Sequence, residues 1–178
     1  MVVFVNDEPK VKVNYTKLYS ENMFLGENVA IESTKSQKFS NQSLKDKITI
    51  VFFGYTSCPD FCPDTLARAN KIFAKLQDKD IQLLFISIDP KDELSKIKKY
   101  VEYFNNDFIG LSINNSDVKK LVEKSGVYAK KVSSTGSIDF YDHTGAIFLI
   151  NKESKLMGLY TPPIKDELII SDLSRMTN

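Results

Sequence analysis

The stretch "KITIVFFGYTSCPDFCPDTLARANKIFAKLQ", residues 47–77, carries the strongest indication of the fold. Its opening run, 47–54, is rich in β-branched and aromatic residues, as expected for a strand that is buried on both faces. The run from Pro63 onward instead places apolar side chains at helical spacing, at Leu66, Ala69, Phe73 and Leu76. The stretch therefore predicts a buried strand that is followed directly by a helix.

Strands and helices are expected to alternate along the rest of the chain. The apolar patterns predict strands at 81–89 and 108–113, helices at 91–104 and 114–126, a strand from 140 that returns after a turn at 151–155, and a last helix over 162–176 that Pro163 could start. This alternation predicts an α/β fold with a mixed, partly parallel central sheet flanked by helices.

Composition and charge narrow the function. A chain of 178 residues is long enough for one domain with a sizeable core, and 42% hydrophobic and 26% charged residues are ordinary for a soluble globular protein. The net charge of +1 argues against nucleic acid or an anionic membrane surface as a partner. No apolar run approaches the roughly 18 residues of a membrane span, so we expect the chain as given to be soluble.

The only two cysteines, Cys58 and Cys62, lie between the first predicted strand and its helix, and a proline follows each of them. This end of a strand is where α/β proteins usually place their chemistry. Residues before proline avoid the α-helical region, and Pro63 suits the first helical position, so Cys62 is expected to be the cap residue. A sulfur there would face unpaired backbone N–H groups and the positive end of the helix dipole, which favour thiolate.

Three roles compete for this pair. A structural disulfide would close so short a loop that it would remove little entropy from the unfolded chain. A dithiol–disulfide redox couple is the second role, although the usual redox spacing is C-x-x-C and this chain has C-x-x-x-C. Metal binding is the third, because soft thiolates with one imidazole suit copper(I), whereas two cysteines alone cannot complete a structural zinc site. Metal or redox chemistry is favoured over a structural bridge.

The chain has one histidine, His143, in "FYDHTGAIFLIN" at 140–151. A lone histidine in a strand is more often a core or surface residue than a metal ligand. His143 begins an apolar strand run, however, from which it could reach the strand-to-helix corner. If a transition metal needs an imidazole here, His143 is the only candidate, and with Cys58 and Cys62 it would form a two-sulfur, one-nitrogen set that fits copper better than a closed zinc site.

A family resemblance rests on three segments in this order: "VFFGYTSCPDFCPDTL" (51–66), "FISIDPKDE" (85–93) and "YDHTGAIFLIN" (141–151). Over about residues 45–176, the chain resembles the Sco/SenC family of copper-binding proteins, which help to assemble cytochrome c oxidase. The resemblance implies a thioredoxin-like fold in residues 41–178 behind an N-terminal extension at 1–40. It also implies copper, as Cu⁺ or Cu²⁺, bound by Cys58, Cys62 and His143, and a place in the pathway that builds the CuA centre of oxidase subunit II.

Three further residues fall on the family's motifs without being expected ligands: Pro63, Asp89 and Asp142. Pro63 would stiffen the backbone behind Cys62. Asp89 could simply cap the next helix or form a turn, or its carboxylate could orient a ligand or a partner near the copper corner. Asp142 has the same two interpretations, with orientation of His143 as the functional one.

The chain departs from the family pattern in three places. The region 28–44 lacks the glycine usual at the turn of an early hairpin. Ser57 stands where the family often has a histidine before the first cysteine, so that accessory imidazole is absent. The membrane anchor usual in the family is missing as well, as expected of a truncated chain or of a free soluble form.

We therefore expect a copper metallochaperone whose cysteines must be reduced to bind metal, with cytochrome c oxidase subunit II and other copper chaperones or thiol reductants as partners. The alternative is a thiol–disulfide oxidoreductase that reduces the cysteines of the CuA-bearing subunit. A peroxiredoxin-like peroxidase has less support, because that chemistry expects T-x-x-C and Thr56 gives T-x-C. The expected location is the periplasmic face of the bacterial inner membrane or, alternatively, the mitochondrial intermembrane space.

Overall fold

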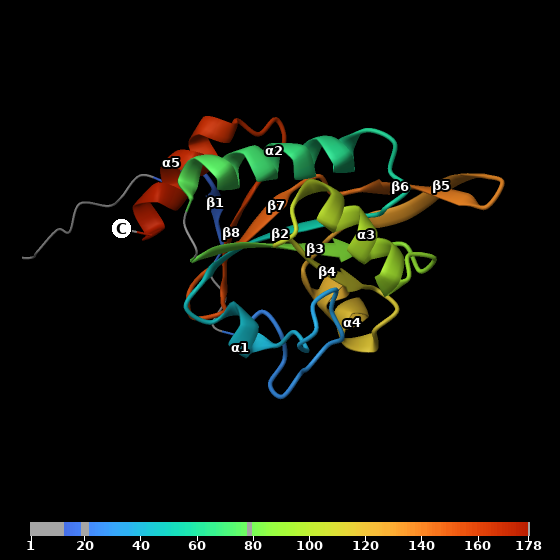
Figure 1. The fold of residues 1–178 in the computed structure, drawn as a ribbon, viewed down its shortest axis with the longest axis horizontal. Coiled ribbons are helices and arrows are strands. Elements are labelled where there is room, and N and C mark those ends of the chain that lie inside the picture. Colours follow the sequence, from blue (N-terminus) through green and yellow to red (C-terminus); the bar gives the residue numbers. More distant parts are fainter. Residues whose placement is uncertain (1–12, 19–21, 78–79, 178) are drawn as a thin grey trace, which may run out of the picture.

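The computed structural model describes residues 13–18, 22–77 and 80–177. Within them, a six-stranded mixed sheet has the order β1–β8–β7–β2–β3–β4 (Figure 1). β3 pairs in parallel with β2 and β4, whereas β7 lies antiparallel to β2 and β8, and β1 antiparallel to β8. The strands are β1 (Thr16–Lys17), β2 (Ile48–Gly54), β3 (Ile81–Ser87), β4 (Ile109–Ser112), β7 (Ile147–Ile150) and β8 (Leu156–Tyr160).

Helices lie on both faces of this sheet (Figure 1). α2 (Phe61–Leu76) packs against α3 (Leu94–Phe104) and α5 (Asp166–Thr177), while α1 (Asn41–Leu44) and α4 (Ser116–Lys124) lie on the opposite side of the sheet from α2 and α5. The α/β prediction, with a mixed sheet flanked by helices, is confirmed. Among the described residues, no helix combines the length and the apolar character needed to cross a membrane.

The parallel strands β2 and β3 form the centre of the core, and every one of their residues is buried. Burial on both faces explains their continuous apolar sequences, because neither face meets water. The described part of residues 1–40 adds Leu25, Ile31 and Phe39 to the same core, whereas residues 1–12 and 19–21 of the predicted extension lie outside the described residues. The packed pair β2–β3 therefore gives rigid support to the chain that leaves β2 at Gly54.

A separate two-stranded sheet, which the sequence patterns do not predict, extends from the body of the molecule at the right of Figure 1. It is an antiparallel hairpin of β5 (Ala129–Thr135) and β6 (Ile138–His143). The single strand expected from residue 140 is therefore two strands, β6 and β7, and only β7 belongs to the main sheet. As a result, His143 is the last residue of a hairpin strand outside the main sheet.

The last helix begins at Asp166 rather than at Pro163. The Arg68 side chain on α2 donates hydrogen bonds to the Ile164 carbonyl (2.7 Å) and, through Nε, to the Asp166 carboxylate (2.9 Å). These bonds hold the segment ahead of α5 against α2 as a loop, and the helix starts only after it.

Candidate metal centre

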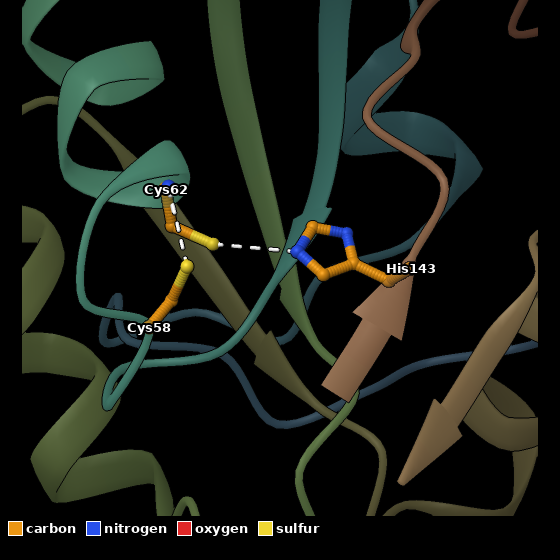
Figure 2. A group of neighbouring side chains, drawn as sticks. All are labelled: Cys58, Cys62 and His143. Carbon is orange, nitrogen blue, oxygen red and sulfur yellow. Dashed lines mark hydrogen bonds between the residues drawn. The ribbon is translucent and has the colours of Figure 1, made fainter. Parts of the chain in front are cut away.

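The two cysteines lie at the carboxyl end of β2, where the chain turns into α2 (Figure 2). The cap residue of α2 is Asp60, so Cys62 lies in the first turn and the prediction that it is the cap is wrong. Backbone N–H groups of the first turn have no helical partner, so Pro63 is accommodated there without being the first helical residue. The Cys58 sulfur instead accepts a hydrogen bond from the Cys62 backbone N–H, at 3.4 Å.

The ring of His143 points toward these sulfurs (Figure 2). Its Nε2 lies 3.6 Å from Cys62 Sγ, and its Nδ1 lies 3.2 Å from the Thr144 carbonyl oxygen. When Nδ1 donates to that carbonyl, Nε2 carries the lone pair and faces the sulfurs. The structure thus brings Cys58, Cys62 and His143 together, with their ligand atoms all within 4.8 Å of one another.

The distance between Cys62 Sγ and His143 Nε2 is compatible with a three-coordinate metal. In a trigonal site with bonds of about 2.3 Å to sulfur and about 2.0 Å to nitrogen, the sulfur and the nitrogen lie about 3.7 Å apart. The corresponding distance in this structure is 3.6 Å. Two thiolates with one imidazole form a set suited to a soft ion that accepts a low coordination number.

One sulfur is sequestered and the other is accessible. Cys62 is fully buried, whereas Cys58 and His143 are half-buried. Three aromatic rings surround the imidazole edge-on, with centroids 5.8 to 6.4 Å from its own: Tyr55, Phe61 and Phe52. These rings restrict rotation of the imidazole, while the Cys58 side chain is only partly covered.

The two thiols differ in acidity. A hydrogen bond from the Cys62 thiol lowers the pKa of Cys58 well below that of an ordinary cysteine, and burial opposes this effect. The same hydrogen bond, followed by burial, raises the pKa of Cys62. When the metal-free pair holds one proton, that proton lies on Cys62 and is shared with Cys58 through a hydrogen bond. Cys58 is therefore the first thiolate to form.

A buried carboxylate that the sequence analysis does not single out, Asp92, anchors the cysteine loop. Its Oδ2 accepts hydrogen bonds from the Thr56 backbone N–H and the Ser87 hydroxyl, both at 2.7 Å, and its Oδ1 accepts from the Thr56 hydroxyl and from Lys96 Nζ at 2.8 Å. Burial alone would raise the pKa of Asp92, but hydrogen bonds from Lys96, Thr56 and Ser87 together lower it. A charged Asp92 thus fixes Thr56, two residues before Cys58.

Asp89 and Asp142 differ in their surroundings. Asp89 is buried, and its Oδ1 accepts hydrogen bonds from the Lys91 backbone N–H (2.9 Å) and from the Tyr141 hydroxyl on β6 (3.1 Å). It therefore forms a turn and also contacts the strand that carries His143. Asp142 is exposed on β6, and in the part of the chain that the structure describes it makes no hydrogen bond with the His143 ring.

Comparison with known proteins identifies relatives of this chain. The SCO1/SenC family model matches residues 19–178. A SCO2-like protein of Rickettsia felis is 31% identical over 145 residues, which cover 79% of this chain and 71% of the relative. The copper-bound structure of Bradyrhizobium japonicum ScoI superposes with a TM-score of 0.74 and 30% identity, covering 83% of this chain and 96% of that one.

The solution structures of apo Sco1 from Thermus thermophilus are similarly close, with a TM-score of 0.75 and 28% identity over 92% of this chain and 96% of that one. The predicted thioredoxin-like fold is confirmed by these Sco neighbours. The family match covers almost the whole described chain, including both cysteines and the histidine. The chain is a member of the SCO1/SenC family.

Proposed function

We propose that this protein binds one copper ion through Cys58, Cys62 and His143 and acts as a copper metallochaperone. The observation that carries the proposal is the convergence of two sulfurs and one imidazole nitrogen within 4.8 Å. The ScoI relative, whose structure holds copper, supports copper as the metal. Cys58 ionises readily, and Cys62 would lose its proton as copper binds, so loading releases protons and requires both cysteines to be reduced.

The copper ion is cargo in this proposal, and the acceptor is the CuA centre of cytochrome c oxidase subunit II. Three protein ligands would leave a coordination position free, and neither Cys58 nor His143 is fully buried, so an acceptor could reach the ion. A thiolate of the acceptor would enter there and displace the ligands one by one, so copper never becomes a free ion. Other copper chaperones or thiol reductants would supply the copper and keep the cysteines reduced.

We place this activity at the periplasmic face of a bacterial inner membrane, or in the mitochondrial intermembrane space if the chain is mitochondrial. Both compartments allow disulfides to form, so the state of the Cys58–Cys62 pair would decide whether copper can bind. Disulfide sulfurs no longer offer thiolates, so the oxidised protein would be inactive as a carrier.

The proposal is tested by mixing the copper-loaded protein with an apo CuA domain and following copper and disulfides in both proteins. We expect copper to move to the CuA domain, and we expect Cys58→Ser, Cys62→Ser and His143→Ala to bind or deliver less of it. Lys119→Ala, on the exposed surface of α4, is the control. Tight copper binding by the Cys58→Ser/Cys62→Ser double variant would contradict the proposal.

A second function, thiol–disulfide oxidoreductase, is favoured by one observation, the accessible low-pKa thiol of Cys58. The Cys58 thiolate would attack a disulfide of the CuA-bearing subunit and release one substrate thiol. Cys62 would lose its proton and attack Cys58, which releases the second substrate thiol and leaves a Cys58–Cys62 disulfide. Reduction of the CuA disulfide that survives both His143→Ala and copper chelation would favour this function.

A further inference from the structure

The strand that carries His143 lies outside the main sheet, yet its imidazole must meet sulfurs that the main sheet supports. β5 and β6 pair only with each other, and every residue of β5 is exposed. A two-stranded ribbon in water is marginally stable by itself. The position of His143 relative to Cys62 therefore depends on contacts between the hairpin and the body of the protein.

The first contact joins Tyr141, on β6, to Asp89. The Tyr141 hydroxyl donates a hydrogen bond of 3.1 Å to Asp89 Oδ1. Asp89 is only 2% exposed and lies two residues after the end of the buried strand β3, so it offers a rigid acceptor. Alternate residues of a strand point to the same face, so Tyr141 and His143 both face the body while Asp142 faces solvent.

The second contact joins the backbone of Tyr141 to Tyr55, three residues before Cys58. The Tyr141 N–H donates to the Tyr55 hydroxyl oxygen at 3.3 Å. The Tyr55 ring, which is 3% exposed, packs edge-on against Tyr141 (5.2 Å between centroids) and against His143 (5.8 Å). One buried side chain thus contacts both the tyrosine and the imidazole.

A third contact lies nearer the turn of the hairpin. Lys91, two residues after Asp89, pairs with Asp139 of β6 at 2.8 Å and donates a hydrogen bond of 3.0 Å to the Ser137 carbonyl. Lys91 is half-exposed, whereas the Asp139 side chain is buried against the body of the protein. The loop between β3 and α3 thus supports the hairpin at two points, Asp89 and Lys91.

We propose that Tyr141 is a positioning residue of the metal site, holding the His143 imidazole opposite Cys62 through its contacts with Asp89 and Tyr55. The site is then preorganised before copper arrives. An imidazole on an unsupported hairpin would lose freedom on binding, and that loss would weaken the affinity. The proposal rests on the proposed copper-binding function for its consequence, but the support of His143 itself is a property of the metal-free protein.

Tyr141→Phe tests the proposal because it removes one hydroxyl and keeps the ring. His143 is the only histidine, so its ring NMR signals report its position without ambiguity. In the metal-free variant, we expect these signals to move from their wild-type shifts, which the surrounding rings determine, and amide exchange in β6 to rise up to about ten-fold. We expect copper affinity, measured by competition with a chromophoric chelator, to fall on the order of ten-fold.

Three further variants separate positioning from general damage. Tyr103→Phe, on the 84% exposed side chain of α3, should leave the ring signals and the affinity unchanged. Asp89→Asn keeps an acceptor oxygen for the Tyr141 hydroxyl and should stay close to wild type. Tyr55→Phe removes the acceptor of the Tyr141 N–H and should move the His143 ring signals of the metal-free protein as Tyr141→Phe does.

Unchanged His143 signals and unchanged copper affinity in Tyr141→Phe would overturn the proposal, as would equal effects of Tyr103→Phe. Failure of the proposed function would look different. In that case the wild-type protein would bind copper weakly, while the His143 signals of the metal-free protein would still respond to Tyr141→Phe.

Discussion

Replacing Asp92 with asparagine removes the charge from a carboxylate that has 0% exposure beside the cysteine loop. Each carboxylate oxygen accepts two hydrogen bonds, from Thr56 and Lys96 on one side and from Thr56 and Ser87 on the other. The asparagine amide must turn an NH₂ group toward one pair of these donors. The N–H donor of that pair, either the Thr56 backbone or Lys96, loses its acceptor, whereas the hydroxyl of the pair can turn and accept from the new NH₂. Lys96 also loses its negatively charged partner.

The expected cost follows from this geometry. A hydrogen bond to a charged group contributes about 1.5–3 kcal/mol. The Lys96 side chain is 48% exposed, so water can hydrate its ammonium and the loss of the ion pair adds no more than about 1 kcal/mol. We therefore expect Asp92→Asn to lower the free energy of unfolding by about 2–4 kcal/mol. That is a large share of the roughly 5–15 kcal/mol available to a protein domain.

Urea unfolding at pH 7, followed by far-UV circular dichroism, measures this loss. Asp107→Asn is the matched control, because Asp107 is an exposed acidic residue in the loop after α3, and it should change stability by no more than about 0.5 kcal/mol. An Asp92→Asn protein within 0.5 kcal/mol of wild type would refute the view that Asp92 anchors the loop.

The pH dependence gives a second test with a defined sign. Hydrogen bonding lowers the pKa of Asp92 in the folded protein below its value in the unfolded chain, which is about 4. The contribution of the charge is therefore present above pH 4 and is lost as the pH falls through the lower, folded-state pKa. The difference in the free energy of unfolding between wild type and Asp92→Asn should shrink as the pH falls below 4. A difference that grows below pH 4 would contradict the lowered pKa of Asp92.

Three further predictions follow from the core and the thiol pair. Cys62→Ala removes the hydrogen bond that lowers the pKa of Cys58, so the midpoint of the pH–rate profile for alkylation of Cys58 should rise toward about 8.5; an unchanged profile would contradict the shared proton. Gly54→Ala would place a Cβ 2.8 Å from Cys62 Sγ and 3.0 Å from Phe85 Cε2. We expect copper affinity to fall and the free energy of unfolding in urea to fall by about 1–3 kcal/mol. Wild-type values of both would show that the sulfur moves freely. Phe53→Ala, at a side chain with 0% exposure, should destabilise the protein by about 3–5 kcal/mol in the same urea assay, and a loss below 1 kcal/mol would show that the core closes around the missing ring.

The central strands could be predicted because a strand that is buried on both faces has a continuous apolar sequence, as in β2 and β3. Helices could be predicted because a helix that is buried on one face has apolar residues at helical spacing, as in α2. The hairpin could not be predicted in the same way. Every residue of β5 is exposed, so its sequence shows neither the alternation of a strand nor the spacing of a helix. Its place is decided by pairing with β6, and the hairpin is held through Tyr141 of β6 on Asp89 and through the Ser137 carbonyl on Lys91.

The ligands of the candidate site could be predicted, but the residue that anchors the cysteine loop could not. Cys58, Cys62 and His143 are the only residues of their types, so a site that needs two sulfurs and an imidazole has no other source. Asp92 was not predictable, because an acidic residue just before a helix is usual at the surface. Only the folded chain brings Thr56, Ser87 and Lys96 around it.

X-ray absorption at the copper edge of the loaded protein tests the central claim most directly, because it counts the atoms bound to the ion. We predict two sulfur neighbours and one nitrogen neighbour in wild type, with the nitrogen lost in His143→Ala and the sulfurs lost in Cys58→Ser/Cys62→Ser. A first shell made only of nitrogen and oxygen, or one that the double cysteine variant leaves unchanged, would contradict the account.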